Sequence, residues 1–200
     1  TYVIHSLAGD VVDRKGASDI KIYFAEGYPE TSGVHRIITA DRKDIIRIDR
    51  LENAEFVVRS GDRADYVIGA DTVDAGSGND TISGGTDISG GDGRDLIRGG
   101  TFVDGGAGND RIERSGAAGG KVEGGLGDDT IVSSGNAWGG EGDDVLEDCI
   151  GAWGGAGNDT LTGCEDARGG AGDDVLDDAT DAQGGGGNDS LTGRGMLRGD

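Results

Sequence analysis

The sequence has few of the residues that usually build a globular core. Its 200 residues include 3 Phe, 2 Trp and 4 Tyr, and 34% are hydrophobic. Two cysteines are too few for a disulfide framework. No stretch approaches the roughly 20 apolar residues that a membrane-spanning helix needs. We therefore expect neither an ordinary single-core globule nor insertion into a membrane.

Basic residues are scarce as well. The chain has 18 Lys and Arg against 39 Asp and Glu, which gives a net charge of -21. A surface this acidic repels phosphate groups, so we expect neither nucleic acid nor an anionic membrane as a partner. The charge indicates a cationic partner instead.

Residues that commonly carry catalysis are nearly absent. His5 and His35 are the only histidines, and no His-Glu-x-x-His, Gly-x-Ser-x-Gly or phosphate-binding glycine motif occurs. We expect this chain not to be an enzyme.

Glycine is the residue that is abundant, and its distribution divides the chain. Residues 1–59 hold ten acids, nine bases and four glycines, whereas residues 60–200 hold 29 acids, nine bases and 39 glycines. In the first part, β-branched runs at 2–4, 20–24, 36–38 and 45–48 predict strands. We expect two domains: an N-terminal β-rich cap over 1–59 and a repeat region over 60–200 that continues beyond residue 200.

A 15-residue repeat fills the second part. Its copies start at 75, 90, 105, 124, 139, 154, 169 and 184, so one interval is 19 residues, and residues 60–65 are a degenerate copy. Position 8 is always apolar and position 14 is apolar or small, which predicts two inward residues per coil on two short strands. We expect the four extra residues to bulge near Gly116–Gly120. The inward positions are Val67, Ile82, Ile97, Ile112, Ile131, Leu146, Leu161, Leu176 and Leu191, and Val73, Ile88, Val103, Val122, Ala137, Ala152, Ala167, Ala182 and Leu197.

Position 6 of every full copy is an aspartate. Coils about 4.7–4.9 Å apart would stack these carboxylates into a column of like charges, which requires counter-ions between them. Ca²⁺ prefers oxygen ligands at about 2.3–2.6 Å and would reach both neighbours from a midway position, whereas Mg²⁺ demands shorter, stricter geometry. Eight loops leave seven gaps, so we expect about seven Ca²⁺ ions. The aspartates are Asp80, Asp95, Asp110, Asp129, Asp144, Asp159, Asp174 and Asp189.

The loop resembles the RTX, or haemolysin-type, calcium-binding repeat Gly-Gly-x-Gly-x-Asp-x-U-x. The resemblance implies an all-β fold, a right-handed parallel β-solenoid or β-roll. It also implies that carbonyls of positions 2 and 4 and the aspartate of one loop bind each ion with carbonyls of positions 1 and 3 and the aspartate of the next. Position 4 of the degenerate copy is Arg63, so that loop is expected to bind no ion. The implied backbone ligands are Gly76, Gly78, Gly90, Gly91, Asp92, Gly93, Gly105, Gly106, Ala107, Gly108, Gly124, Gly125, Leu126, Gly127, Gly139, Gly140, Glu141, Gly142, Gly154, Gly155, Ala156, Gly157, Gly169, Gly170, Ala171, Gly172, Gly184 and Gly186.

The period departs from the family, because RTX coils usually carry nine-residue motifs on both edges. Here a six-residue return replaces the second motif, so we expect calcium along one edge only. The resemblance implies a secreted, extracellular or cell-surface protein whose roll folds on extracellular calcium. Two alternatives stay open: a structural or adhesive surface-layer unit that self-associates with calcium, and the carrier module of a larger secreted hydrolase or toxin.

Two residue pairs fall at matching repeat positions. Cys149 and Cys164 share position 11, and we expect stacked unpaired thiols rather than a disulfide. Trp138 and Trp153 share position 15, and we expect them to pack against each other rather than to form a sugar-binding platform. Ice binding would need a regular threonine array, which position 3 does not supply.

Overall fold

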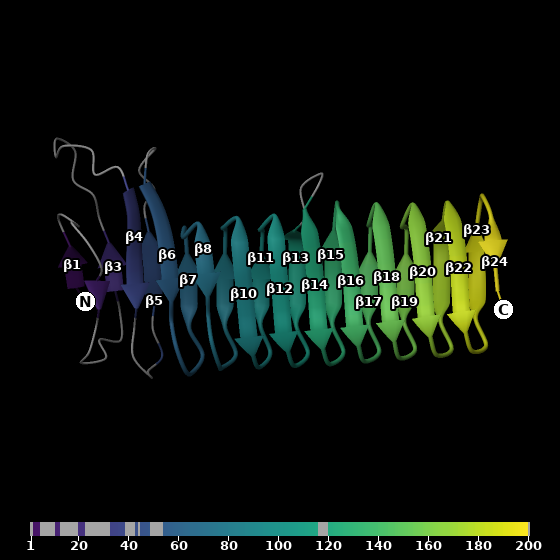
Figure 1. The fold of residues 1–200 in the computed structure, drawn as a ribbon, viewed down its shortest axis with the longest axis horizontal. Helices are drawn as coiled ribbons and strands as arrows, with labels where there is room; N and C mark the ends of the chain where they lie inside the picture. Colours follow the sequence, from purple (N-terminus) through teal and green to yellow (C-terminus); the bar gives the residue numbers. More distant parts are fainter. Residues whose placement is uncertain are drawn as a thin grey trace.

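Strands alternate along the chain between two parallel sheets, which together form a β-solenoid (Figure 1). The structure is a computed structural model that describes residues 2–4, 11–12, 20–22, 33–38, 43, 45–48, 54–115 and 120–199. Each sheet has 12 strands, and every strand except those at the ends of the sheets pairs in parallel with the strands one coil before and after it. The described residues contain no helix, and hence none that could cross a membrane. The predicted all-β solenoid is confirmed.

The odd-numbered strands form the first sheet, called the odd sheet below: β1 (Tyr2–Ile4), β3 (Ile20–Ile22), β5 (Ile45–Ile48), β7 (Tyr66–Ile68), β9 (Thr81–Ser83), β11 (Leu96–Arg98), β13 (Arg111–Ser115), β15 (Thr130–Ser133), β17 (Val145–Glu147), β19 (Thr160–Thr162), β21 (Val175–Ala179) and β23 (Ser190–Gly193).

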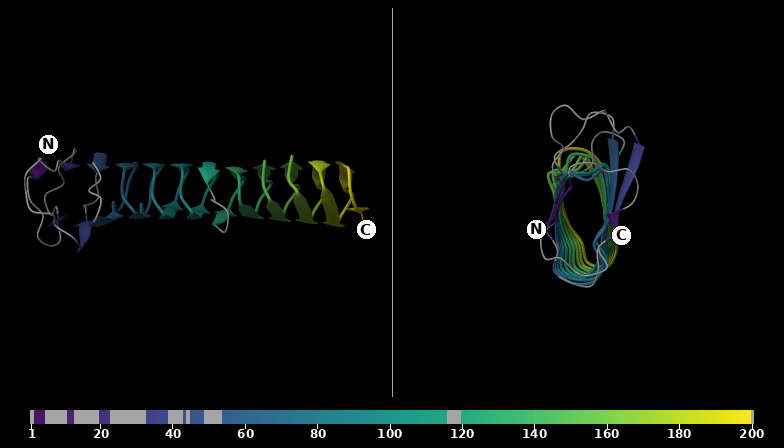
Figure 2. Two further views of the ribbon diagram at one scale, coloured as in Figure 1. Left: turned by 90° about the horizontal axis from the view of Figure 1, so that it is seen from above. Right: turned by 90° about the vertical axis from the view of Figure 1, so that its left-hand side faces the viewer.

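The even-numbered strands form the second, or even, sheet: β2 (Val11–Val12), β4 (Gly33–Ile38), β6 (Ala54–Arg59), β8 (Thr72–Asp74), β10 (Asp87–Asp92), β12 (Phe102–Ala107), β14 (Lys121–Leu126), β16 (Asn136–Glu141), β18 (Gly151–Ala156), β20 (Asp166–Ala171), β22 (Asp181–Gly186) and β24 (Leu197–Arg198). Seen end-on, the coils superpose as flattened rings (Figure 2).

The register follows the 15-residue repeat. Ile82 lies beside Ile97, and Ile97 beside Ile112, so equal repeat positions stack from coil to coil. Where the interval is 19 residues, Val103 still pairs with Val122. The extra residues therefore fall between β13 and β14, as predicted, although residues 116–119 themselves lie outside the described residues.

The core is the stack of the two inward positions. Position 8 is buried from Val67 to Leu176, and Leu191 packs partly against it. Position 14 is buried from Val73 to Ala182. Leu197 was predicted to face inward, but its side chain is 43% exposed because β24 is the end strand of its sheet and pairs only with β22.

The side chain at position 11 also faces inward, and its size varies inversely with that of the side chain at position 14. In the coil that holds Val103, position 11 is Gly100, and a Cβ there would overlap the Val103 side chain. In the coil that holds the smaller Ala152, position 11 is the buried Cys149. The two cysteines thus fill core volume that larger aliphatic residues fill in earlier coils, and both thiols are free, as expected.

The strands of the N-terminal part belong to the same two sheets. β1, β3, β4 and β5 match the four predicted runs, and β6 extends the even sheet to β8. Phe56, Ile37 and Ile46 are fully buried and join the same core. Both sheets therefore run across the composition change at residue 59, and the division into a cap and a repeat domain stays a prediction.

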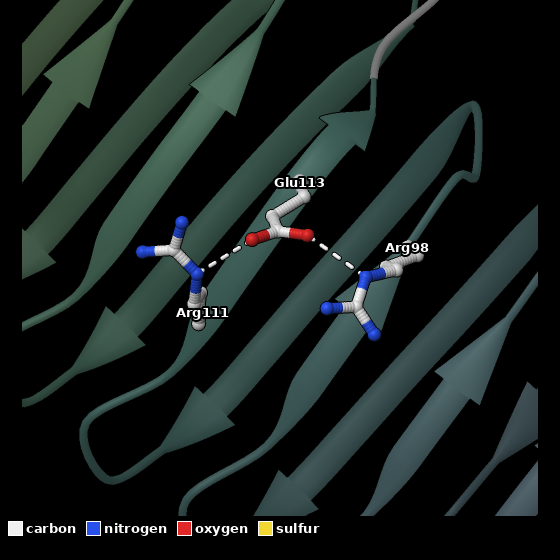
Figure 3. Close-up of polar contacts among 3 residues, drawn as sticks. All are labelled: Arg98, Arg111 and Glu113. Atoms are coloured by element: carbon white, nitrogen blue, oxygen red, sulfur yellow. Dashed lines mark hydrogen bonds and ion pairs between the residues drawn. The ribbon is translucent and has the colours of Figure 1, made fainter.

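Ion pairs connect neighbouring coils on the outer face of the odd sheet. Glu113 on β13 accepts a hydrogen bond from Arg98 Nε on β11 at 2.8 Å and another from Arg111 Nε on its own strand at 2.6 Å (Figure 3). These two bonds lower the pKa of Glu113. The side chains are partly exposed, so solvent screens the pairs and they contribute little to stability.

Candidate metal centre

The predicted aspartates lie along one long edge of the solenoid. From β10 to β22, each even-sheet strand ends at repeat position 3 and the next odd-sheet strand begins at position 7, so positions 4–6 form the connecting loop. Gly142–Asp144, for example, joins β16 to β17. Because the strands stack in register, all eight loops stack as well. We call this row of loops the aspartate edge, and the opposite row of turns the return edge.

The position-6 carboxylates point into the solenoid. From Asp80 to Asp174 they are only 1–2% exposed. In each, Oδ1 accepts a hydrogen bond from the backbone N–H of the aspartate one coil earlier, at 2.6–3.0 Å. The other oxygen, Oδ2, is buried without a hydrogen-bond partner in Asp80, Asp95, Asp110, Asp129, Asp144, Asp159, Asp174 and Asp189.

The glycine at position 1 leaves room for these unpartnered oxygens. A Cβ on Gly105 would lie 2.6 Å from Asp110 Oδ2 and 2.5 Å from the carbonyl oxygen of Gly124 in the next coil. Two oxygens from neighbouring coils therefore converge on one small space. Only a cation or a donor hydrogen can satisfy such an arrangement. Position 1 is glycine in seven of the eight full loops and Ala75 in the first.

Without a cation, these carboxylates are costly to ionise. Burial, with a smaller contribution from neighbouring carboxylates, raises the pKa of Asp80, Asp110, Asp129 and Asp144 to about 7. Burial raises the pKa of Asp159 to about 6. Burial of the same repeat position in successive coils explains both the direction of the pKa shift and its recurrence.

Backbone carbonyls supply further oxygens at the same edge. The glycines at positions 2 and 4 have positive φ, for example +127° at Gly140 and +125° at Gly142. At both positions the carbonyl oxygen of the equivalent residue one coil earlier occupies the place of a Cβ, so these carbonyls point from loop to loop. Some of these carbonyls already accept one backbone hydrogen bond: at position 3 Ala156 accepts from Gly142 N–H at 2.8 Å, and at position 2 Gly76 accepts from Asp92 N–H at 2.7 Å. The predicted residues are thus brought together, coil by coil.

Side chains alone do not complete a metal site. Within the described ranges, no three Asp, Glu, His or Cys side chains converge on one point. Any ion at the aspartate edge must therefore combine carboxylates with backbone carbonyls. An all-oxygen donor set of this kind suits a hard cation such as Ca²⁺.

A second row of side-chain hydrogen bonds was missed by the sequence reasoning. Position 5 is Asn or Asp in every full loop except one, and its Oδ1 accepts the backbone N–H of position 5 in the following coil. Asp143 accepts in this way from Asn158 at 2.7 Å, and Asn158 from Asp173 at 2.8 Å. The recurrence of Asn and Asp at position 5 was visible in the sequence, but only the structure shows where their oxygens point.

The comparison with known protein families agrees with this geometry. The family model of the RTX calcium-binding nonapeptide repeat, in four copies, matches residues 67–87 and 152–163. These segments contain the loops that end in Asp80 and Asp159. They are RTX calcium-binding nonapeptide repeats. No curated protein and no solved structure matches the chain.

The RTX match covers two segments of the repeat, implies Ca²⁺ as their ligand and identifies no catalytic domain. The other loops of the aspartate edge share the same stacked geometry and the same unpartnered Oδ2 atoms.

The paired tryptophans lie outside this edge, on the outer face of the even sheet. Their ring centroids are 4.6 Å apart and their planes differ by 5°, so they stack as predicted. Lys121 lies over the Trp138 ring at 5.2 Å, and Arg168 lies over the Trp153 ring at 5.5 Å. Each indole is thus covered on one side by its partner and on the other by a cation, which leaves no open ring face for a sugar.

Proposed function

We propose that this chain is a non-catalytic module that folds when Ca²⁺ binds along its aspartate edge. One observation carries the proposal: a continuous column of buried Asp Oδ2 atoms that have no hydrogen-bond partner. A divalent cation in each gap would lie between two such carboxylates, each of which borders the next gap as well. With eight full loops there are seven gaps, so about seven ions are expected.

The residues at each gap fit such an ion by their chemistry. Between the loops that start at Gly139 and Gly154, the ion would be held by Asp144 and Asp159 with carbonyls of Gly140, Gly142, Gly154 and Ala156. Bound calcium supplies positive charge beside these buried carboxylates. Because the ligands come from two coils, binding also holds the coils together, which couples calcium affinity to folding.

We further propose that the module works outside the cell, in a secreted or cell-surface protein. RTX repeats are typical of secreted bacterial proteins, and a chain of net charge -21 repels itself when calcium is low. Low cytosolic calcium would keep it unfolded, and extracellular calcium would fold it. Recovery of the full-length protein only from the cytosolic fraction of its host would contradict this location.

The calcium site can be tested with two adjacent residues of one loop. Asp144→Asn keeps the size and the Oδ1 acceptor of the buried side chain but removes its charge, so we expect equilibrium dialysis to show about two fewer bound ions, one for each gap that Asp144 borders. Asp143→Asn removes one charge from the exposed neighbour and keeps its acceptor, so the full number of ions should remain. Equal losses in the two variants would contradict the assignment of position 6.

A further inference from the structure

Positions 5 and 6 tie the same pair of loops together in opposite directions. Between the loops that start at Gly139 and Gly154, Asp143 Oδ1 accepts from Asn158 N–H at 2.7 Å. In the same gap, Asp159 Oδ1 accepts from Asp144 N–H at 2.9 Å. The position-6 bond is buried beside the unpartnered Oδ2, whereas the position-5 bond is exposed on the outside of the loop.

The two bonds stand in different relations to the expected ion. The position-6 side chain would serve both contacts: its Oδ1 accepts the backbone N–H of the neighbouring loop, and its unpartnered Oδ2 would face the ion. The position-5 oxygen lies on the exposed outside of the loop and is not one of the expected ion ligands. Its contact therefore holds two loops in register without using an ion ligand.

We propose that the position-5 side chains are positioning residues for calcium: each fixes the spacing of two loops whose oxygens share one ion. This inference rests on the proposed calcium-binding function. It concerns residues that touch no ion and act through the backbone of the next loop.

One gap of the stack lacks this contact. Position 5 of the second full loop is Arg94, whose own N–H donates to Asn79 Oδ1 at 2.9 Å. An arginine side chain has donors but no acceptor, so Arg94 cannot receive the N–H of Asn109. The row resumes where Asn109 Oδ1 accepts from Asp128 N–H at 3.2 Å.

The inner bond of that gap is intact, since Asp95 N–H donates to Asp110 Oδ1 at 2.8 Å. The gap between the loops that start at Gly90 and Gly105 therefore differs from its neighbours in position 5, and Arg94 adds a positive charge to it. We infer that its ion is the first to leave as calcium falls.

The test restores the missing acceptor. Arg94→Asn and Arg94→Ala both remove the positive charge, but only Asn can accept the Asn109 N–H. The chain is loaded with calcium alone and mixed rapidly with a fluorescent chelator, so that the release of each class of ion is timed. We expect a fast phase of about one ion in the unchanged chain. One exposed hydrogen bond corresponds to about a twofold to tenfold change in an equilibrium constant, so Arg94→Asn should slow this phase by that factor relative to Arg94→Ala.

The converse variants use an intact gap. Asn158→Ala removes the acceptor for Asp173 N–H and should create a second fast phase, whereas Asn158→Asp keeps the acceptor and should not. A general loss of stability would instead speed every phase together. If the chain binds calcium but Arg94→Asn and Arg94→Ala release it identically, the positioning role is wrong while the proposed function stands. If the unchanged chain binds no calcium, the proposed function itself is overturned.

Discussion

At the scale of single residues, two neighbours in each loop have similar side chains and different surroundings. Asp144 is buried with one oxygen unpartnered, and Asp143 is exposed and hydrogen-bonded to the next loop. The backbone fixes this difference, because the glycines before them turn the chain so that position 6 faces inward and position 5 outward. Similar chemistry therefore serves two purposes: charge for an ion inside, and an acceptor for the neighbouring loop outside.

The last full loop contains a matched pair of glycines that tests the role of backbone conformation. Gly187 has a φ of +135°, and a Cβ there would overlap the Gly172 carbonyl. Gly186, the residue before it, has open space around its Cα. We expect Gly187→Ala to destabilise the calcium-bound protein by at least about 1 kcal/mol, because positive φ alone costs an alanine that much.

Thermal unfolding in saturating calcium measures this difference. Gly186→Ala serves as the control and should leave the midpoint nearly unchanged. If both substitutions lower the midpoint alike, the loop is sensitive to any side chain, and the stacking of position 4 on the previous carbonyl is not what requires glycine.

The position-6 aspartates could be predicted from the sequence, and the position-5 row could not. A carboxylate at a fixed repeat position next to glycines with positive φ has few explanations besides a metal, so periodicity alone pointed to Asp80 and its equivalents. The hydrogen bond from Arg94 N–H to Asn79 Oδ1 depends on whether the Asn79 side chain turns toward the next loop or toward solvent. Both orientations are compatible with the sequence, and only the structure distinguishes them.

At the scale of strands, the repeat predicted most of the architecture because stacked coils place equal positions side by side. The apolar side chains at positions 8 and 14 were predicted to face inward and do so in nearly every coil. The pairing of large position-14 residues with Gly100, and of alanines with Cys149, was not predicted, since it depends on contacts across the return edge. In the N-terminal part the paired strands lie further apart in the sequence, since Gly33 pairs with Ala54 and Ile45 with Tyr66, 21 residues later in each case.

The stacked indoles provide a probe of how strands β16 and β18 pair. Two indoles whose centroids are 4.6 Å apart and whose planes differ by 5° should absorb less near-UV light than separate indoles, and this hypochromism requires both coils to be folded in register. Trp138→Leu or Trp153→Leu should each abolish the hypochromism and reduce stability by about 0.5–1.5 kcal/mol. Hypochromism that survives in either single variant would show that it does not arise from this stack.

At the scale of the whole molecule, charge and fold are inseparable. The hydrophobic core is thin, because few side chains in each coil face inward. A column of buried carboxylates runs along the aspartate edge. Without calcium, the burial of the apolar side chains has to offset the cost of burying these carboxylates. Calcium ions would instead link the carboxylates of neighbouring coils. The central claim is that the repeat region, and with it the stacked solenoid, depends on calcium for its stability.

The most direct measurement is far-UV circular dichroism of residues 1–200 during a calcium titration that starts in chelator, with magnesium as the control. We predict little β signal in chelator, a cooperative gain as calcium is added, and no comparable gain with magnesium, whose stricter geometry does not suit the loops. A full β spectrum in chelator, unchanged by calcium, would contradict the account, because the core would then hold the solenoid without the ions.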